Sequence, residues 1–471
     1  MAVEKNKTSL RKFSFGLRTG LMLTVCTMPS AFAADTLTDA LVKAYQSNPQ
    51  LMSERANLRA TDEEVAQAIA RWRPTITLSG DYSRVETESK TDPSPDNPLG
   101  VNVERRNDPW NAAVTAQQTV FAGGTILAQR RQADAQVRAG RARLHSTEQS
   151  VILDTVTSFM NVVRDESVVK LNQTNVELLK KQLEAAKARF DVGEITRTDV
   201  SQAEARLASG QFQLTSAEAN LIAARTFYER TVGEAPGTLE TKPAVPALPE
   251  SEVAARAVAN NDNPTLVAAR EAQEAADYAI DFAVGQMLPT VTVQASYGRS
   301  GQEYGPETIS DDTRLTAAAR FPLYQGGAEW SNIRQAKELF NKARMDTEFA
   351  RRSTDERVSN SWEAYRAAKA SVEANRQQVK ASEIAFEGVQ QELEVGSRTT
   401  LDVLDQQQEL LNARVALVRS ERDEIVAGYS LLASVGKLTA QELQLPVQVY
   451  DPKGNYEMQT WRPLGAATYE N

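Results

Sequence analysis

The sequence predicts an α+β membrane protein in which several copies share one transmembrane β-barrel and continue it as a long α-helical barrel of coiled-coil hairpins. Three observations lead to this fold class. The chain repeats itself, residues 110–235 and 323–445 contain no proline, and four short segments alternate between apolar and polar residues. Long helices and short strands are therefore expected in each of two internal repeats.

The first 33 residues have the features of a secretory signal peptide. Five basic residues accompany a short apolar region around Leu21–Val25, and Ala31-Phe32-Ala33 forms a cleavage site. The apolar run is too short to anchor the chain in a bilayer core about 30 Å thick. We expect a mature chain that begins at Ala34 and has lost Cys26, so that disulfide and thiol chemistry are not expected.

The charge of the chain excludes one class of partner. The formal net charge is −9, and it becomes −13 when the five positive charges and one negative charge of residues 1–33 are removed. An acidic exported chain is not expected to bind nucleic acid. No later segment reaches the ~18 consecutive apolar residues of a membrane-crossing helix, so any crossing must use strands.

The two halves of the chain align at fixed offsets. Asn48-Pro49 matches Asn263-Pro264 at an offset of 215, and Gly193 matches Gly396 at an offset of 203. Further matches at the offset of 203 are Val120–Gly124 with Leu323–Gly327, Asp199-Val200 with Asp402-Val403, and Val232-Gly233 with Val435-Gly436. We expect a first repeat over residues 34–242 and a second over 243–445, each with a helix, two strands and a long helical hairpin. The tail, 446–471, is expected to lie on an equatorial belt with the proline-marked linker.

The strand segments have the alternation that a membrane strand needs. In the first, the apolar residues Ile76, Leu78 and Tyr82 alternate with Thr75, Thr77, Ser79 and Asp81, and segments near residues 110, 290 and 315 behave similarly. A half-buried soluble hairpin has the same pattern, but the signal peptide and the polar loops at 86–108 and 300–312 favour the membrane. Since the smallest bacterial barrels have about eight strands and open edges are not tolerated in lipid, four strands per chain require oligomerisation.

The helices give the length of the periplasmic part. Thr125–Phe190 would extend roughly 100 Å at 1.5 Å per residue. Asp199–Val232 would extend about half as far, and Pro49–Arg73, stacked above it, would add about 35 Å and nearly match the long helix. Apolar residues in steps of three and four along both shorter helices, 200–228 and 401–432, predict helix-on-helix packing.

Together these residues make the chain similar to the TolC-like family of Gram-negative outer-membrane efflux and secretion channels. The resemblance is carried by the paired motifs above and most sharply by Gly396–Asp405. It implies a homotrimer in the outer-membrane lipid with its helical part in the periplasm. It also implies a periplasmic adaptor protein and an inner-membrane transporter, ABC-type or proton-driven, as partners in drug efflux or type I secretion.

The tips of the two hairpins carry the candidate site. Gly193 and Gly396 mark the turns, and Arg398, Asp402 and Asp405 follow the second of them. Spacing alone favours ordinary helix capping, because threonine and aspartate stabilise helix starts.

The resemblance assigns a role to each of these side chains. Asp402 and Asp405 correspond to a selectivity ring, while Arg398, Thr198 and Asp199 correspond to a gate that holds the tips closed. Leu393 departs from the family, whose well-known members have a tyrosine there.

Other functions are less well supported. The single histidine, His145, is expected within a long helix, and no His/Cys cluster or phosphate-binding glycine loop is present. We expect no enzyme, no metal and no cofactor. The alternative to a channel is a trimeric coiled-coil envelope protein without a conduit, and the sequence does not identify the cargo.

Overall fold

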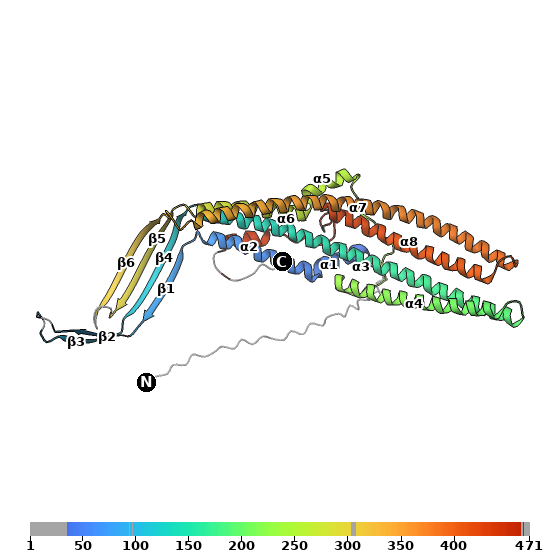
Figure 1. Ribbon diagram of the computed structural model, residues 1–471, viewed down its shortest axis with the longest axis horizontal. Coiled ribbons are helices and arrows are strands. Elements are labelled where there is room, and N and C mark those ends of the chain that lie inside the picture. The colour runs from blue at the N-terminus through green and yellow to red at the C-terminus, as the bar shows by residue number, and fades with distance from the viewer. Residues whose placement is uncertain (1–34, 94, 97, 303–307, 463–464, 466–471) are drawn as a thin grey trace, which may run out of the picture.

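Long helices make up most of the length of the molecule, and a curved sheet extends from one end of them (Figure 1). The computed structural model describes residues 35–93, 95–96, 98–302, 308–462 and 465. The expected signal peptide, with Cys26, lies outside these residues. Long as they are, the helices of the described ranges include none with the apolar stretch needed to cross a membrane.

The helices occupy the two proline-free runs and their flanks. They are α1 (Leu37–Ser47), α2 (Pro49–Ala70), α3 (Thr125–Asp191), α4 (Arg197–Val232), α5 (Glu252–Asp262), α6 (Pro264–Gly285), α7 (Ala328–Glu394), α8 (Thr400–Val435) and α9 (Gly454–Trp461). The helices α3 and α7 each contain 67 residues and span about 100 Å. Each packs against two shorter helices of its own half, α3 against α2 and α4, and α7 against α6 and α8. The helix α6 also packs against α3 and so joins the two halves.

One antiparallel sheet contains all four strands predicted from the sequence. The strands of the structure are β1 (Thr75–Tyr82), β2 (Val85–Thr91), β3 (Val101–Asn107), β4 (Trp110–Ala122), β5 (Thr290–Gly301) and β6 (Ile309–Arg320). The order in the main sheet is β1-β4-β5-β6, with Leu78 opposite Val114 and Val293 opposite Ala317. Every residue of β1 and β6 is exposed. A hairpin half-buried by the chain's own helices is therefore not what the sequence forms.

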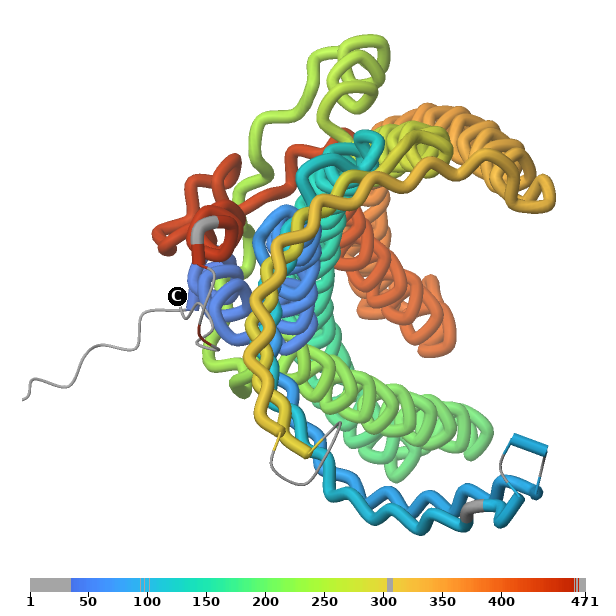
Figure 2. Tube along the Cα trace, turned by 90° about the vertical axis from the view of Figure 1, so that its left-hand side faces the viewer, coloured from blue at the N-terminus to red at the C-terminus, as the bar shows by residue number. Residues whose placement is uncertain are grey.

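The prediction of a polar loop at 86–108 is wrong for most of that range, because the range contains the paired strands β2 and β3. Glu86 lies opposite Arg106, and their Oε1 and Nη2 atoms are 2.5 Å apart. Charged residues on both strands hide the alternation that marks a strand with one apolar face. The first half thus has four strands where two were expected. Figure 2 shows this hairpin continuing the open arc of the main sheet.

Corresponding helices of the two halves have equal lengths. The pairs α1 and α5, α2 and α6, and α4 and α8 contain 11, 22 and 36 residues. Each half begins with two helices where one was expected, because Asn48 and Asn263 each end one helix and cap the next. The Nδ2 atoms of these buried asparagines donate to the carbonyls of Thr231 (3.0 Å) and Ser434 (2.9 Å). The repeated Asn-Pro motif thereby ties each helix junction to the end of a hairpin.

The largest apolar core lies where α1, α3, α4, α8 and the chain after α8 meet. Phe159 and Tyr228 pack there with ring centroids 6.4 Å apart, and both are almost fully buried. Burial raises the pKa of Tyr228 to about 12. On α8, Val403, Leu410 and Leu431 are buried, and this helix contacts both α3 and α7.

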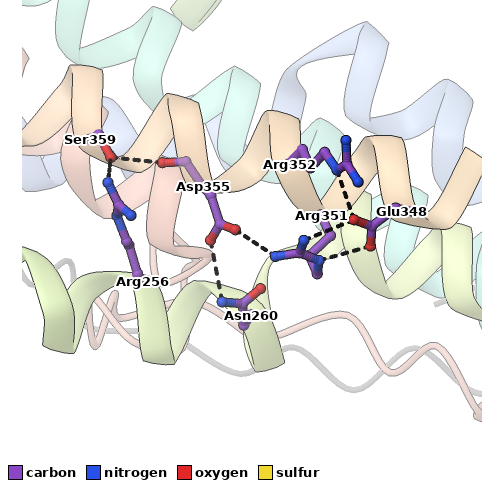
Figure 3. Close-up of polar contacts among 7 residues, drawn as sticks. All are labelled: Arg256, Asn260, Glu348, Arg351, Arg352, Asp355 and Ser359. Carbon is purple, nitrogen blue, oxygen red and sulfur yellow. Dashed lines mark hydrogen bonds and ion pairs between the residues drawn. The ribbon is translucent and has the colours of Figure 1, made fainter.

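The helix α5 is fastened to α7 by polar contacts (Figure 3). The Nδ2 atom of Asn260 lies 3.3 Å from an Oδ1 atom of Asp355, whose other oxygen lies 2.9 Å from Arg351. Hydrogen bonds from Arg351 and Arg352 lower the pKa of Glu348 to about 2. Polar side chains of α5 thus contact α7, and Ala255 and Ala259 are buried in one cluster with Val358 of α7.

The tail contains the helix α9, and no helix was predicted there from the sequence. This helix lies against α2. Asn455 donates from Nδ2 to Oδ2 of Asp62 at 2.9 Å, and the Tyr456 hydroxyl donates to Oδ1 of Asp134 at 2.8 Å. Side-chain contacts with α2 and α3 therefore hold a helix that has little amphipathic pattern of its own.

Candidate functional site

The candidate site lies at the turns where each long helix folds back. Gly193 follows α3 with φ 81°, and Gly396 follows α7 with φ 78°. A Cβ atom at either position would meet nothing within 4 Å. Glycine is therefore required by the left-handed backbone of the turn and not by lack of space.

Both returning helices start with the same capping box. At the first tip, the Thr196 amide and hydroxyl donate to Oδ2 of Asp199 at 2.9 and 2.8 Å. At the second tip, the Thr399 amide and hydroxyl donate to Oδ2 of Asp402 at the same two distances. These hydrogen bonds, the backbone one first, lower the pKa of each aspartate. The capping interpretation of the tips is confirmed, with Thr196 as the cap of α4 and Thr399 as the cap of α8.

Each turn is also bridged by an ion pair, and the two pairs have opposite polarity. At the first tip, Arg189 on α3 lies 3.0 Å from Glu194 in the turn. At the second, Glu392 on α7 lies 2.9 Å from Arg398 in the turn. The basic group thus belongs to the long helix in one hairpin and to the turn in the other.

The structure places the predicted gate residues apart within one protomer. Arg398 pairs with Glu392, and it does not contact Thr198 or Asp199 of the same chain. Thr198 is exposed in the first turn of α4, and Leu393 is half-buried near the end of α7. The gate assignment concerns contacts between neighbouring copies and stays a prediction.

The two predicted ring residues have different partners. Asp402 is held by Thr399, whereas Asp405 forms an ion pair with Arg206 on α4. The sequence did not single out five tip residues with a structural role, Arg189, Glu194, Thr196, Arg206 and Glu392. Glu392 carries a local signal, an opposite charge six residues before Arg398, but Arg206 is 199 residues from its partner and has no such signal.

The single histidine, His145, was the remaining candidate for catalysis, and its contacts are structural. His145 lies within α3 with Nδ1 3.4 Å from Oε2 of Glu148, whose Oε1 accepts from the Ala440 amide at 2.7 Å. Over the described residues, no group of three or more His, Cys, Asp or Glu side chains is arranged to hold a metal ion.

An uncovered four-stranded sheet, helices about 100 Å long and charged hairpin tips define the class of an outer-membrane export channel subunit. A profile of the outer membrane efflux protein family matches residues 40–229 and 256–437, and the chain belongs to that family. It is therefore a protein of the outer membrane that serves efflux.

Individual relatives agree with this assignment. The chain is 36% identical to outer membrane efflux protein BepC of Brucella suis, over 91% of each chain. It is 27% identical to outer membrane protein TolC of Vibrio cholerae, covering 88% of this chain and 94% of the relative. The crystal structure of the Campylobacter jejuni CmeC outer membrane channel superposes with a TM-score of 0.75 at 16% identity, covering 90% and 89% of the two chains. The predicted family resemblance is confirmed.

Proposed function

We propose that three copies of this chain close into one channel that passes substrates from the periplasm through the outer membrane. The observation that carries this function is the uncovered sheet. Ile76 is 74% exposed, Leu78 is 77% exposed and Leu315 is 78% exposed in the single chain. Large apolar side chains on a surface of this kind call for lipid or a partner.

The edges of the sheet support closure by further copies. The strands β1 and β6 are its two edges, and within the described part of the chain each has one side without a strand partner. Unpaired N–H and C=O groups are not tolerated in lipid, so β1 of one copy must pair with β6 of the next. The open arc of the protomer in Figure 2 has the shape of a wall segment. The number three follows the resemblance to TolC-like channels.

The same closure brings the hairpin tips of neighbouring copies together. Arg398 is half-exposed and in the proposed trimer would pair with Thr198 or Asp199 of the next chain, while Asp402 and Asp405 would form a ring of carboxylates around the opening. Carboxylates crowded in this way attract cations. We propose that Gly193 and Gly396 keep both turns tight enough for such a constriction.

The remaining assignments follow from the passive character of such a duct. It is proposed to be no enzyme and to have no cofactor, so a periplasmic adaptor and an inner-membrane transporter would supply recruitment and energy. The halves 34–242 and 243–445, with corresponding helices of equal length, would give each copy two similar wall segments.

Two measurements on the purified protein test this function. Short crosslinkers between Thr77→Cys in β1 and Thr316→Cys in β6 should give covalent dimers and trimers and nothing larger, while either single variant stops at dimers. In planar bilayers the wild type should give discrete conductance steps. Trimers that conduct neither as wild type nor with Arg398→Asp would favour the alternative, a coiled-coil envelope protein without a conduit.

A further inference from the structure

Three polar contacts join α8 to the first hairpin among the described residues. Arg422 Nε lies 3.0 Å from Asn161 Oδ1, and Gln407 Nε2 lies 2.6 Å from Asn175 Oδ1, both on α3. The third is the ion pair between Arg206 on α4 and Asp405 on α8. It is the contact nearest to the tips, nearly three helical turns after the cap of α4.

We propose that Arg206 is a positioning residue of the gate, which holds the second hairpin against the first and neutralises Asp405 while the tips are closed. The inference rests on the proposed function, because it concerns a carboxylate of the proposed ring. According to this proposal, a cationic side chain of the first hairpin neutralises a carboxylate of the second hairpin.

The Arg206–Asp405 ion pair can form and separate at low cost in free energy. The Arg206 side chain is 39% exposed and that of Asp405 is 55% exposed, so both groups remain in contact with water when they part. The neighbouring pair Asn175–Gln407 is buried, and its separation would leave amide groups without partners. Hairpin movement near the tips therefore costs least at Arg206–Asp405.

The other ion pairs near the tips cannot play this part. Arg189–Glu194, Glu392–Arg398 and Lys187–Glu204 each join groups of one hairpin, so they move with it. Arg206–Asp405 joins two hairpins, and it must lengthen when α8 moves away from α4.

The charge of the opening consequently depends on its state. With the hairpins in contact, Asp402 accepts hydrogen bonds from Thr399, and Asp405 forms an ion pair with Arg206. When the hairpins part, Asp405 loses its cation and its negative charge faces the passage. Such a gate would bind multivalent cations weakly when closed and more strongly when open, since attraction follows the uncompensated charge.

The test uses the full-length channel in planar bilayers with La³⁺ added on the periplasmic side. Arg206→Gln should raise the conductance without La³⁺ and lower the half-blocking La³⁺ concentration about fivefold, which corresponds to one exposed ion pair lost per chain. Asp405→Asn should raise the conductance equally, with no further rise in the double variant. Arg206→Lys should resemble the wild type, and the exchange Arg206→Asp with Asp405→Arg should restore the closed conductance.

Arg225→Gln is the matched control, because it removes the same charge from the same helix. Arg225 pairs with Glu166 at 2.8 Å within the first hairpin, so conductance and block should not change. The proposal would be overturned if the conductance effects of Arg206→Gln and Asp405→Asn were additive. It would also be overturned if Arg206→Gln had the conductance and the La³⁺ block of the wild type. A wild type that does not conduct would instead reject the proposed channel function.

Discussion

Asp199 and Asp402 occupy the same position in the two hairpins, each accepting two hydrogen bonds from the threonine three residues before it. The local structure of the tips is thus repeated, whereas their charges are not. The turn of the first hairpin carries Glu194 and the turn of the second carries Arg398. A common scaffold therefore presents different groups to whatever meets the tips.

Replacing the cap of α8 should loosen its first turn. Thr399→Ala removes the hydroxyl that pairs with Asp402, and loss of such a cap costs about 1 kcal/mol. Hydrogen exchange of peptides covering residues 400–406 should become several-fold faster, with exchange in the middle of α8 unchanged. Thr400→Ala, at the first helical residue, is the control, and equal effects of the two variants would reject the capping role.

The capping boxes should also make the tips sensitive to acid. Hydrogen bonds from Thr196 and Thr399 lower the pKa of Asp199 and Asp402 below the ordinary value of 3.8. A group with a lowered pKa stabilises the fold fully above its unfolded value and loses this contribution as the pH falls through its folded value. Exchange at both tips, corrected for its intrinsic pH dependence, should thus be constant from pH 7 to 5 and rise below about pH 4. A rise that begins near pH 6 would point to another group.

The sequence predicted the elements whose signals are local. Proline-free runs located α3, α4, α7 and α8, and the glycines at 193 and 396 marked their turns. Strand alternation located β1, β4, β5 and β6. These features depend on residues close together in the chain, and the paired motifs of the two halves reinforced them.

The elements that were missed depend on contacts between distant residues. The strands β2 and β3 have few apolar residues and so lack a marked apolar face, and Glu86 pairs with Arg106 across the hairpin. The helix α9 is held by Asp62 and Asp134, more than 300 residues away. At the site, spacing found the capping aspartate Asp402, but the partner of Asp405 could not be inferred before α4 and α8 were brought together.

Reversing the charge in the second turn should open the closed channel. Arg398→Asp breaks the pair with Glu392 and places a third acidic group beside Glu392 and Asp402. If Arg398 also holds the neighbouring chain, the closed conductance in planar bilayers should rise. Arg189→Asp breaks the corresponding pair of the first hairpin and is the control. A rise of equal size in both variants would show general loosening of the tips and not a gate at Arg398.

Truncating Phe159, a fully buried aromatic side chain, should destabilise the largest apolar core of the protein. Phe159 has no exposed surface and packs against Tyr228. Phe159→Ala should cost about 3–5 kcal/mol because it leaves a cavity, and Phe159→Leu should cost about 1.5 kcal/mol or less. Thermal unfolding in detergent should rank wild type, Leu and Ala in that order, and an unchanged Tm for Ala would contradict this core.

The tail helix α9 should be attached more firmly when Asp62 is made neutral. Asp62 is 2% exposed, and burial raises the pKa of its carboxyl despite the hydrogen bond from Asn455 and the nearby charge of Arg141. A carboxyl with a raised pKa favours the folded state fully below its unfolded value of 3.8, and this contribution is lost as the pH rises through the folded value. Asp62→Asn keeps an oxygen that accepts from Asn455 and removes the buried charge.

At pH 7 the Asp62→Asn variant should therefore have a higher Tm than the wild type, and the difference should vanish near pH 4. Asp62→Leu, which removes the acceptor as well, should lower the Tm at both values, since the buried Asn455 amide then keeps only the Arg59 carbonyl, at 3.3 Å, of its two acceptors. Limited proteolysis of the tail should follow the same order, because α9 contacts α2 through this pair. A lower Tm for Asp62→Asn at pH 7 would mean that the charge of Asp62 stabilises the fold through Arg141.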